Sequence, residues 1–327
     1  MTDVSGLTRD QIKQFRDQGY LVVEDVIDVE RYLDPLVAEY GERLDEIVAG
    51  LAGSLPSNYE GLPFGSRLTR LYADTGRSWA QHFDFSLPFK GVKPDEPCHF
   101  GPAVFAMLRN DRILDVVESL IGPEIYSNPV QHVRLKPPQH LVPSDPRIGK
   151  GLLGATEWHQ DASVVVEEAD NTEILTVWIP LVDVDERNGC LCVVPRNHKR
   201  GLLQHCIDAL RGKYLPTAKF DADRAKPLPM RRGSILVMDK MTPHSSLENQ
   251  SDDVRVSMDL RFNPIGEPTG RPEFPGFVAR SRRDPAAELR DPLAWEESWL
   301  ATRERMSAHP ELVPAFTRWR EDAPGCA

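Results

Sequence analysis

Two periods of hydrophobic residues divide the chain into a helical part and a β part. In the first part, apolar positions recur at the three- and four-residue spacing of amphipathic helices. This spacing predicts helices over residues 9–18, 29–52 and 111–121. A short apolar run between the first two, 20–27, has the composition of a strand. Region 1–122 is therefore expected to be mainly helical.

Beyond this region, apolar residues come in short runs separated by turn residues, as in a β-sandwich or barrel. The runs predict strands at residues 124–138, 156–166, 173–184, 189–198, 231–246 and 254–264. A loop-rich segment, 201–229, interrupts the series, and an extension of loops and one helix follows over 266–327. We expect one domain over 1–327, mainly β with flanking helices, with its β core at about 123–265.

Segment 53–102 is irregular but rich in proline, glycine and aromatic residues. A long irregular segment in a compact domain is usually a lid, a binding loop or disorder, and the aromatic content argues against disorder. Together with the 201–229 loop, it is the expected wall of a substrate pocket. Three of its residues are candidate substrate contacts, although each also suits a structural role: Arg67, Tyr72 and Trp79.

Composition narrows the class of partner and the cellular setting. The net charge is −11 and the basic residues are scattered, which argues against nucleic acid or an anionic membrane as a partner. The sequence shows neither a signal-peptide pattern nor an apolar run long enough for a membrane helix. The five cysteines form an odd, unpatterned set, which predicts reduced thiols and a cytoplasmic location.

The strongest chemical signal is the stretch from Glu157 to Asp161. Side chains alternate faces along a strand, so His159 and Asp161 are expected on one face, with Glu157 beside them. The best candidate for a third ligand is His244, just past an apolar run. Two imidazoles and one carboxylate, with other positions open, are typical of non-haem Fe(II) oxygenases. A zinc site that supports hydrolysis is the alternative.

Arg255 is the second signal. Three polar side chains share its strand face by alternation: Ser257, Asp259 and Arg261. If this face looks into the β core, the buried guanidinium requires an anionic partner, which a carboxylate cosubstrate would supply. The alternative is a surface arginine paired with a neighbouring aspartate.

These residues resemble a known family. The His159-x-Asp161 motif, the NG-x-L-x-V-x-P-x-x-H block at 188–198, His244 and Arg255 occur in the order found in the phytanoyl-CoA dioxygenase family of Fe(II)/2-oxoglutarate oxygenases. The resemblance covers about 105–262. It departs from the family at the end of the block, where Pro-Arg-Asn-His replaces the more usual Pro-Gly-Ser-His.

The resemblance implies a fold and a ligand set. The fold would be a double-stranded β-helix, the cupin-like jelly roll, and His159, Asp161 and His244 would bind Fe(II). Arg255 would hold the distal carboxylate of 2-oxoglutarate. Three further residues match family positions at the cosubstrate: Ser246, Trp178 and His132.

The resemblance also implies a reaction. With O2, 2-oxoglutarate would be converted to succinate and CO2 while a C–H bond of a small organic molecule is hydroxylated or desaturated. Related halogenases have a small residue in place of Asp161, so the carboxylate favours oxygen chemistry. Natural-product or other secondary metabolites, acyl-CoA thioesters and amino acids are all candidate substrates. A non-catalytic cupin-type binding protein is the rival, and the sequence leaves the oligomeric state open.

Overall fold

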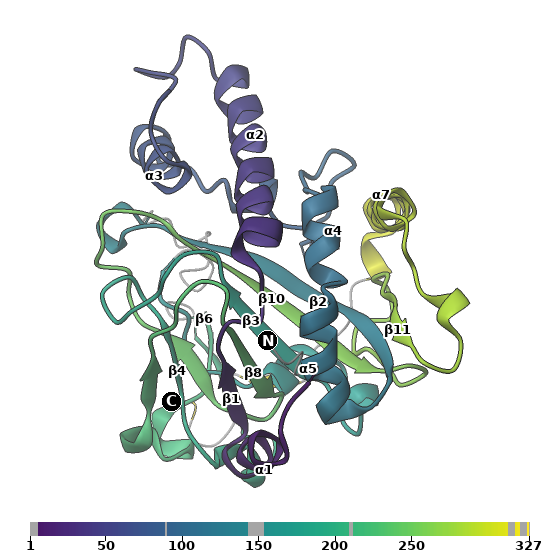
Figure 1. The fold of residues 1–327 in the computed structure, drawn as a ribbon. Helices are drawn as coiled ribbons and strands as arrows, with labels where there is room; N and C mark the ends of the chain where they lie inside the picture. Colours follow the sequence, from purple (N-terminus) through teal and green to yellow (C-terminus); the bar gives the residue numbers. More distant parts are fainter. Residues whose placement is uncertain are drawn as a thin grey trace.

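A six-stranded antiparallel sheet forms the centre of the molecule (Figure 1). The computed structural model describes residues 6–88, 90–142, 154–208, 212–312, 318–320 and 326. In spatial order, the strands are β1 (Tyr20–Val23), β8 (Ile235–Asp239), β3 (Leu175–Pro180), β10 (Arg255–Pro264), β2 (Glu124–Lys136) and β11 (Phe277–Ser281). The register between β10 and β2 shifts between Asp259 and Arg261.

Two three-stranded sheets complete the β structure. One contains β7 (Lys226–Leu228), β4 (Leu191–Val193) and β9 (His244–Ser246). The other contains β12 (Trp319–Arg320), β5 (His205–Asp208) and β6 (Gly212–Tyr214). A single antiparallel bridge joins His159 to His244 and so attaches the 157–161 stretch to β9.

Helices cover the outside of the large sheet. They are α1 (Arg9–Gln18), α2 (Asp34–Gly50), α3 (Phe64–Thr75), α4 (Pro102–Leu108), α5 (Asp111–Ile121) and α7 (Pro292–Ala308), with a π-helix at Val29–Leu33. In Figure 1, α5 runs along the face of β2 and β10, and α4 packs against α2 and α7. A capping box between Thr8 and Gln11 starts α1. None of the described helices is long and apolar enough to cross a membrane.

Short 3-10 helices lie in the connections. They are at Ala80–His82, Gln139–Leu141, Asp161–Val164, Glu167–Ala169, Asn197–Arg200, Thr217–Lys219, Ala222–Arg224, Pro285–Ala287 and Pro310–Leu312. The one that begins at Asp161 shapes the metal site described below.

Strand β10 shows how the sheet separates core from site. Nearly all of its residues are buried, so neither face meets solvent. The apolar set on one face joins the main hydrophobic core with the helices: Val256, Met258, Leu260 and Phe262. The opposite face carries a polar set, Arg255, Ser257, Asp259 and Arg261, and its three charged members line the pocket between the six-stranded sheet and the β7-β4-β9 sheet. Burial of the apolar face drives the folding that holds the polar face in place.

Most predicted elements are confirmed, and the mainly β fold with flanking helices is observed. The predicted strand over 156–166 is wrong, because the chain makes one bridge at His159 and then a 3-10 turn. The 201–229 segment contains three short strands as well as loops. Segment 53–102 contains α3, since Leu68, Leu71 and Tyr72 give that part a buried helical face.

The prediction that all cysteines are reduced is also wrong. Cys206 and Cys326 form a disulfide across 120 residues, while Cys98, Cys190 and Cys192 are free thiols. Pairing depends on the distance between the cysteines in the folded chain, and no regular spacing along the sequence indicated it. The disulfide removes the cysteine argument for a cytoplasmic location.

Candidate metal and cosubstrate site

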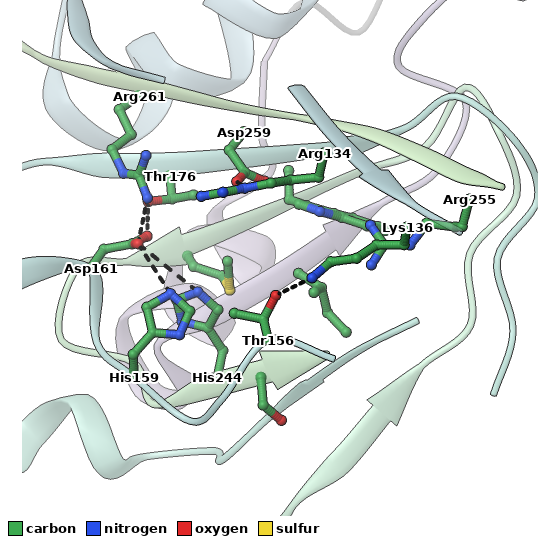
Figure 2. A pocket seen from close by; sticks show the side chains of 14 residues that line it. Arg134, Lys136, Thr156, His159, Asp161, Thr176, His244, Arg255, Asp259 and Arg261 are labelled. Atoms are coloured by element: carbon green, nitrogen blue, oxygen red, sulfur yellow. Dashed lines mark hydrogen bonds and ion pairs between the residues drawn. The ribbon is translucent and has the colours of Figure 1, made fainter. Parts of the chain in front are cut away.

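Three predicted ligands meet in one place. Nitrogen and oxygen atoms of His159, Asp161 and His244 all lie within 4.8 Å of one another. Asp161 Oδ1 is 3.8 Å from the Nε2 atom of His159 and 4.0 Å from that of His244. The two imidazole centroids are 4.2 Å apart, and all three side chains point to a common centre (Figure 2). Two nitrogens and one carboxylate oxygen are the donor set of a non-haem Fe(II) site.

Local backbone structure brings the ligands together. His159 and His244 exchange two backbone hydrogen bonds, of 3.0 and 2.9 Å, which place their side chains next to each other. The chain then turns into the 3-10 helix, and Asp161 faces the two rings. Gln160 points away, as alternation predicted, because its side chain bonds to the backbone of Gly201, Met241 and Leu203.

The orientation of both imidazoles is set by the backbone. His159 Nδ1 lies 2.9 Å from the carbonyl oxygen of Glu157, and His244 Nδ1 lies 3.0 Å from that of Thr242. A carbonyl can only accept, so Nδ1 carries the hydrogen in each ring and Nε2 keeps its lone pair for a metal. Burial, aided by the neighbouring His244, lowers the pKa of His159 to about 3, which keeps this ligand neutral at physiological pH.

Asp161 is held through both of its oxygens. Thr176 donates to Oδ2, and Arg261 forms an ion pair with Oδ1 (Figure 2). Burial by itself raises the pKa of the Asp161 carboxyl, but Arg261 and the two histidines outweigh it, and the net pKa is lowered. The carboxylate is therefore ionised before any metal binds.

The metal ligands form one end of a pocket between the six-stranded sheet and the β7-β4-β9 sheet. The pocket contains about 430 Å³ of space between atoms, part of it open to solvent. Its walls come from β2, β3, β8 and β10 of the large sheet and from β4 and β9 of the smaller one. Side chains on this face of β2, β3 and β10 are mainly polar, whereas their neighbours in sequence belong to the core.

The other end of the pocket is lined by basic side chains. Arg255 is 2% exposed and its guanidinium lies 5.5 Å from the centre of the Trp178 ring. It donates to Ser257 at 2.6 Å, while its Nε is buried without a hydrogen-bond partner among the described residues. Burial lowers the pKa of Arg255 to about 10, so it stays charged at neutral pH.

Lys136 stands opposite Arg255. The two are paired across β2 and β10, and both line the pocket. Lys136 Nζ donates to the Gly154 carbonyl and, at 2.9 Å, to Thr156 Oγ1. Burial, followed by the charge of Arg255, lowers the pKa of Lys136 well below its usual range. Like charges directly across a strand pair are unfavourable, so a carboxylate between these two residues would relieve the repulsion. The distal carboxylate of 2-oxoglutarate fits this end of the pocket.

Of the three other residues predicted to contact the cosubstrate, one lines the pocket and two do not. Trp178 lines the pocket, whereas Ser246 and His132 are not among its lining residues. Ser246 Oγ accepts from the backbone N–H of Thr156 at 2.8 Å. The His132 ring pairs with Asp84 at 2.9 Å. Cosubstrate contacts for these two residues stay predictions.

The candidate substrate residues also lie away from this pocket. Glu157 is partly exposed and does not line it. Arg67 pairs with Asp45 on α2, Tyr72 is buried in α3, and Trp79 donates to Thr75 at 3.0 Å. These three pack within the helical layer, and their contact with substrate stays a prediction.

Sequence reasoning missed several pocket residues. They are Arg134, Lys136, Thr156 and Thr176, while Asp259 and Arg261 were placed on the correct face without a role. A signal for two of them was present: Arg134 and Lys136 alternate with Val133 and Leu135 of the core. Without knowledge of which β2 face meets the pocket, this alternation had no chemical meaning.

Comparisons with known proteins agree with this geometry. The family model described as Phytanoyl-CoA dioxygenase (PhyH) matches residues 15–257. Phytanoyl-CoA dioxygenase domain-containing protein 1 of Danio rerio is 25% identical over 262 residues, 75% of this chain and 86% of that protein. Methylphosphonate hydroxylase of Gimesia maris is 33% identical over 211 residues, 62% of this chain and 70% of that protein. The solved apo structure of the non-heme monooxygenase ThoJ superimposes with a TM-score of 0.59 and 19% sequence identity. The match covers 92% of this chain and 99% of the ThoJ chain, so the two proteins share a fold.

Fold, ligand set and family model together define a non-haem iron oxygenase. The chain belongs to the phytanoyl-CoA dioxygenase family. It is a dioxygenase that uses Fe(II), with 2-oxoglutarate as cosubstrate and O2 as oxidant. His159, Asp161 and His244 match the donor set that this metal requires.

Proposed function

We propose that the protein hydroxylates or desaturates a C–H bond of a small organic molecule, a natural product or other secondary metabolite. In hydroxylation, 2-oxoglutarate, O2 and R–H would give succinate, CO2 and R–OH. The observation that carries the proposal is one pocket with a His-Asp-His ligand set at one end and Arg255 with Lys136 at the other. Acyl-CoA thioesters and amino acids are alternative substrates within the same reaction class.

Each group of pocket residues has its own role in the proposed reaction. His159, Asp161 and His244 hold the iron, and Arg255 holds the distal carboxylate of 2-oxoglutarate with Lys136 opposite. Bound iron with 2-oxoglutarate and O2 supplies the oxidising power for C–H cleavage. The protein's own contribution is to orient the substrate and exclude water from this buried site.

The proposed architecture is a double-stranded β-helix within one domain over 1–327. It is supported by two antiparallel sheets that contribute opposite walls of one pocket, with the ligands on β9 and the preceding bridge. Asp161 supports oxygen insertion over halogenation, because its carboxylate would bind the iron where related halogenases have a small residue.

A substrate screen tests the proposal. Purified protein with Fe(II), ascorbate, 2-oxoglutarate and O2 would be offered a library of natural products, and products would be read by mass spectrometry for a gain of one oxygen or a loss of two hydrogens. Succinate should appear in step with product, and both should vanish without O2 or in Asp161→Ala. Turnover that continues without O2 would instead indicate a metal-dependent hydrolase, and undiminished turnover in Asp161→Ala would contradict the ligand assignment.

A further inference from the structure

Arg134 is a pocket arginine to which the proposed function gives no role. It projects from β2 beside Lys136 and belongs to the pocket lining. Its Nε donates to Asp259 Oδ2 at 2.9 Å, and among the described residues Nε is the only atom of its guanidinium with a hydrogen-bond partner. Asp259 therefore fixes one edge of the guanidinium and leaves both terminal nitrogens for a ligand.

Arg134 differs from the other pocket arginines in the solvent exposure of its side chain. Its side chain is 25% exposed, whereas that of Arg261 is 5% exposed. Arg255 is buried and lies beside Lys136 in Figure 2. In Figure 2 the Arg134 side chain extends along the wall towards Thr176, on the side of the metal ligands. Of the three pocket arginines, Arg134 is therefore the most accessible from solvent.

Positive charges outnumber negative charges among the residues and expected ligands of the pocket. Three arginines and a divalent metal ion face two aspartates, Asp161 and Asp259, and the cosubstrate dianion. One positive charge remains among these groups, which favours an anionic substrate.

We propose that the substrate carries an oxyanion, a carboxylate or a phosphonate, and that the terminal nitrogens of Arg134, oriented by Asp259, bind it beside the metal. Two parallel N–H donors suit either oxyanion. The contact would fix which C–H bond faces the iron, because it anchors the substrate a short distance from the ligand set. This inference rests on the proposed function and adds a substrate class to it.

The test measures anion preference in the loaded protein. Wild-type protein with Ni(II), a redox-inert stand-in for iron, and 2-oxoglutarate would be titrated calorimetrically with methylphosphonate and with carboxylate fragments, each paired with its neutral amide or diester. We expect the anions to bind at least about tenfold more tightly than their neutral partners, since a charge-assisted hydrogen bond is lost in the latter. In Arg134→Gln this preference should disappear, while 2-oxoglutarate affinity stays within about twofold.

Two further variants keep the test interpretable. Arg134→Lys keeps the positive charge but loses the two parallel N–H donors of the guanidinium. It should retain part of the preference for anions, even if Arg134→Gln fails to fold. Arg282→Gln, an exposed arginine paired with Glu118 far from the pocket, should retain all of it. Equal binding of anions and neutral partners in the wild type would overturn the proposal. A loss of 2-oxoglutarate affinity in Arg134→Gln that matches the loss for the fragments would also overturn it, because Arg134 would then serve the cosubstrate. If Ni(II) and 2-oxoglutarate did not bind at all, the proposed function on which this inference rests would be overturned instead.

Discussion

At the scale of single residues, the site depends on a buried carboxylate with several partners. Asp161 must face two imidazoles and a metal, yet it is 2% exposed and bonded to Thr176 and Arg261. Arg261 in turn donates to the Val130 carbonyl at 2.6 Å, which fixes the guanidinium. Partners of this kind hold a ligand in position before the metal arrives. Arg261 is thus a positioning residue for the metal carboxylate.

Arg261→Gln should weaken metal binding. The ion pair would be lost, Asp161 would be free to rotate, and Ni(II) affinity should fall about tenfold to a hundredfold. Calorimetric titration of the variant with Ni(II), with and without 2-oxoglutarate, measures this. Arg187→Gln is the matched control, since that arginine pairs with Asp252 on the open surface. An unchanged Ni(II) affinity in Arg261→Gln would show that Asp161 needs no such support.

At the scale of elements, strand β5 supports the backbone of the segment from His159 to Asp161. It places His205, fully buried, against the backbone between the first two ligands. His205 Nε2 accepts from the Gln160 N–H at 3.0 Å, and Nδ1 donates to the Leu203 carbonyl at 2.8 Å. Burial lowers the pKa of His205 to about 4, so the ring is neutral in the folded protein.

This lowered pKa predicts a pH dependence of stability. The unfolded chain binds a proton at His205 below the ordinary pKa of 6.5, while the folded chain does so only below about 4. Stability from this residue is therefore complete above pH 6.5 and is lost as the pH falls towards 4. His205→Gln keeps an acceptor but does not titrate, so its thermal midpoint should fall less over this window than that of the wild type. Identical pH profiles of the two proteins would contradict this assignment.

At the scale of the whole molecule, the C-terminal segment closes onto the β core. β12 pairs in parallel with β5, and Trp319 donates to the Ser163 carbonyl at 2.8 Å, two residues beyond Asp161. The Cys206–Cys326 disulfide ties the same region to the end of the chain. The final segment thus contacts the 3-10 helix that begins with a metal ligand.

Loss of this disulfide should lower global stability. A closed loop of 120 residues restricts the unfolded chain, and disulfides of this kind typically contribute about 2–4 kcal/mol. Urea unfolding of Cys326→Ser, and of the wild type with reductant, should both show a loss of that order. Cys98→Ser, which removes a free and partly exposed thiol, is the control. Wild-type stability that reductant and Cys326→Ser both leave unchanged would contradict the prediction.

Local patterns determined a large part of this protein. The capping box at Thr8 specified the start of α1, because its hydrogen bonds join residues three apart. Alternation along β10 placed Arg255 and Asp259 on one face, since successive strand residues point to opposite sides. The motif residues His159, Asp161 and His244 could be chosen as ligands from residue type, order and family resemblance.

Tertiary structure decided what depends on distances between remote segments. Only the register of β10 against β2 sets Lys136 opposite Arg255 and brings Arg134 to Asp259. The turn at Asp161 replaced an expected strand because its carboxylate bonds to Thr176 and Arg261, far along the sequence. The sequence alone determined which residues can bind a metal and a carboxylate, whereas packing of the two sheets decided which of them share a pocket. Metal binding, ion pairing and burial act over a few ångströms in space, whatever the separation along the chain.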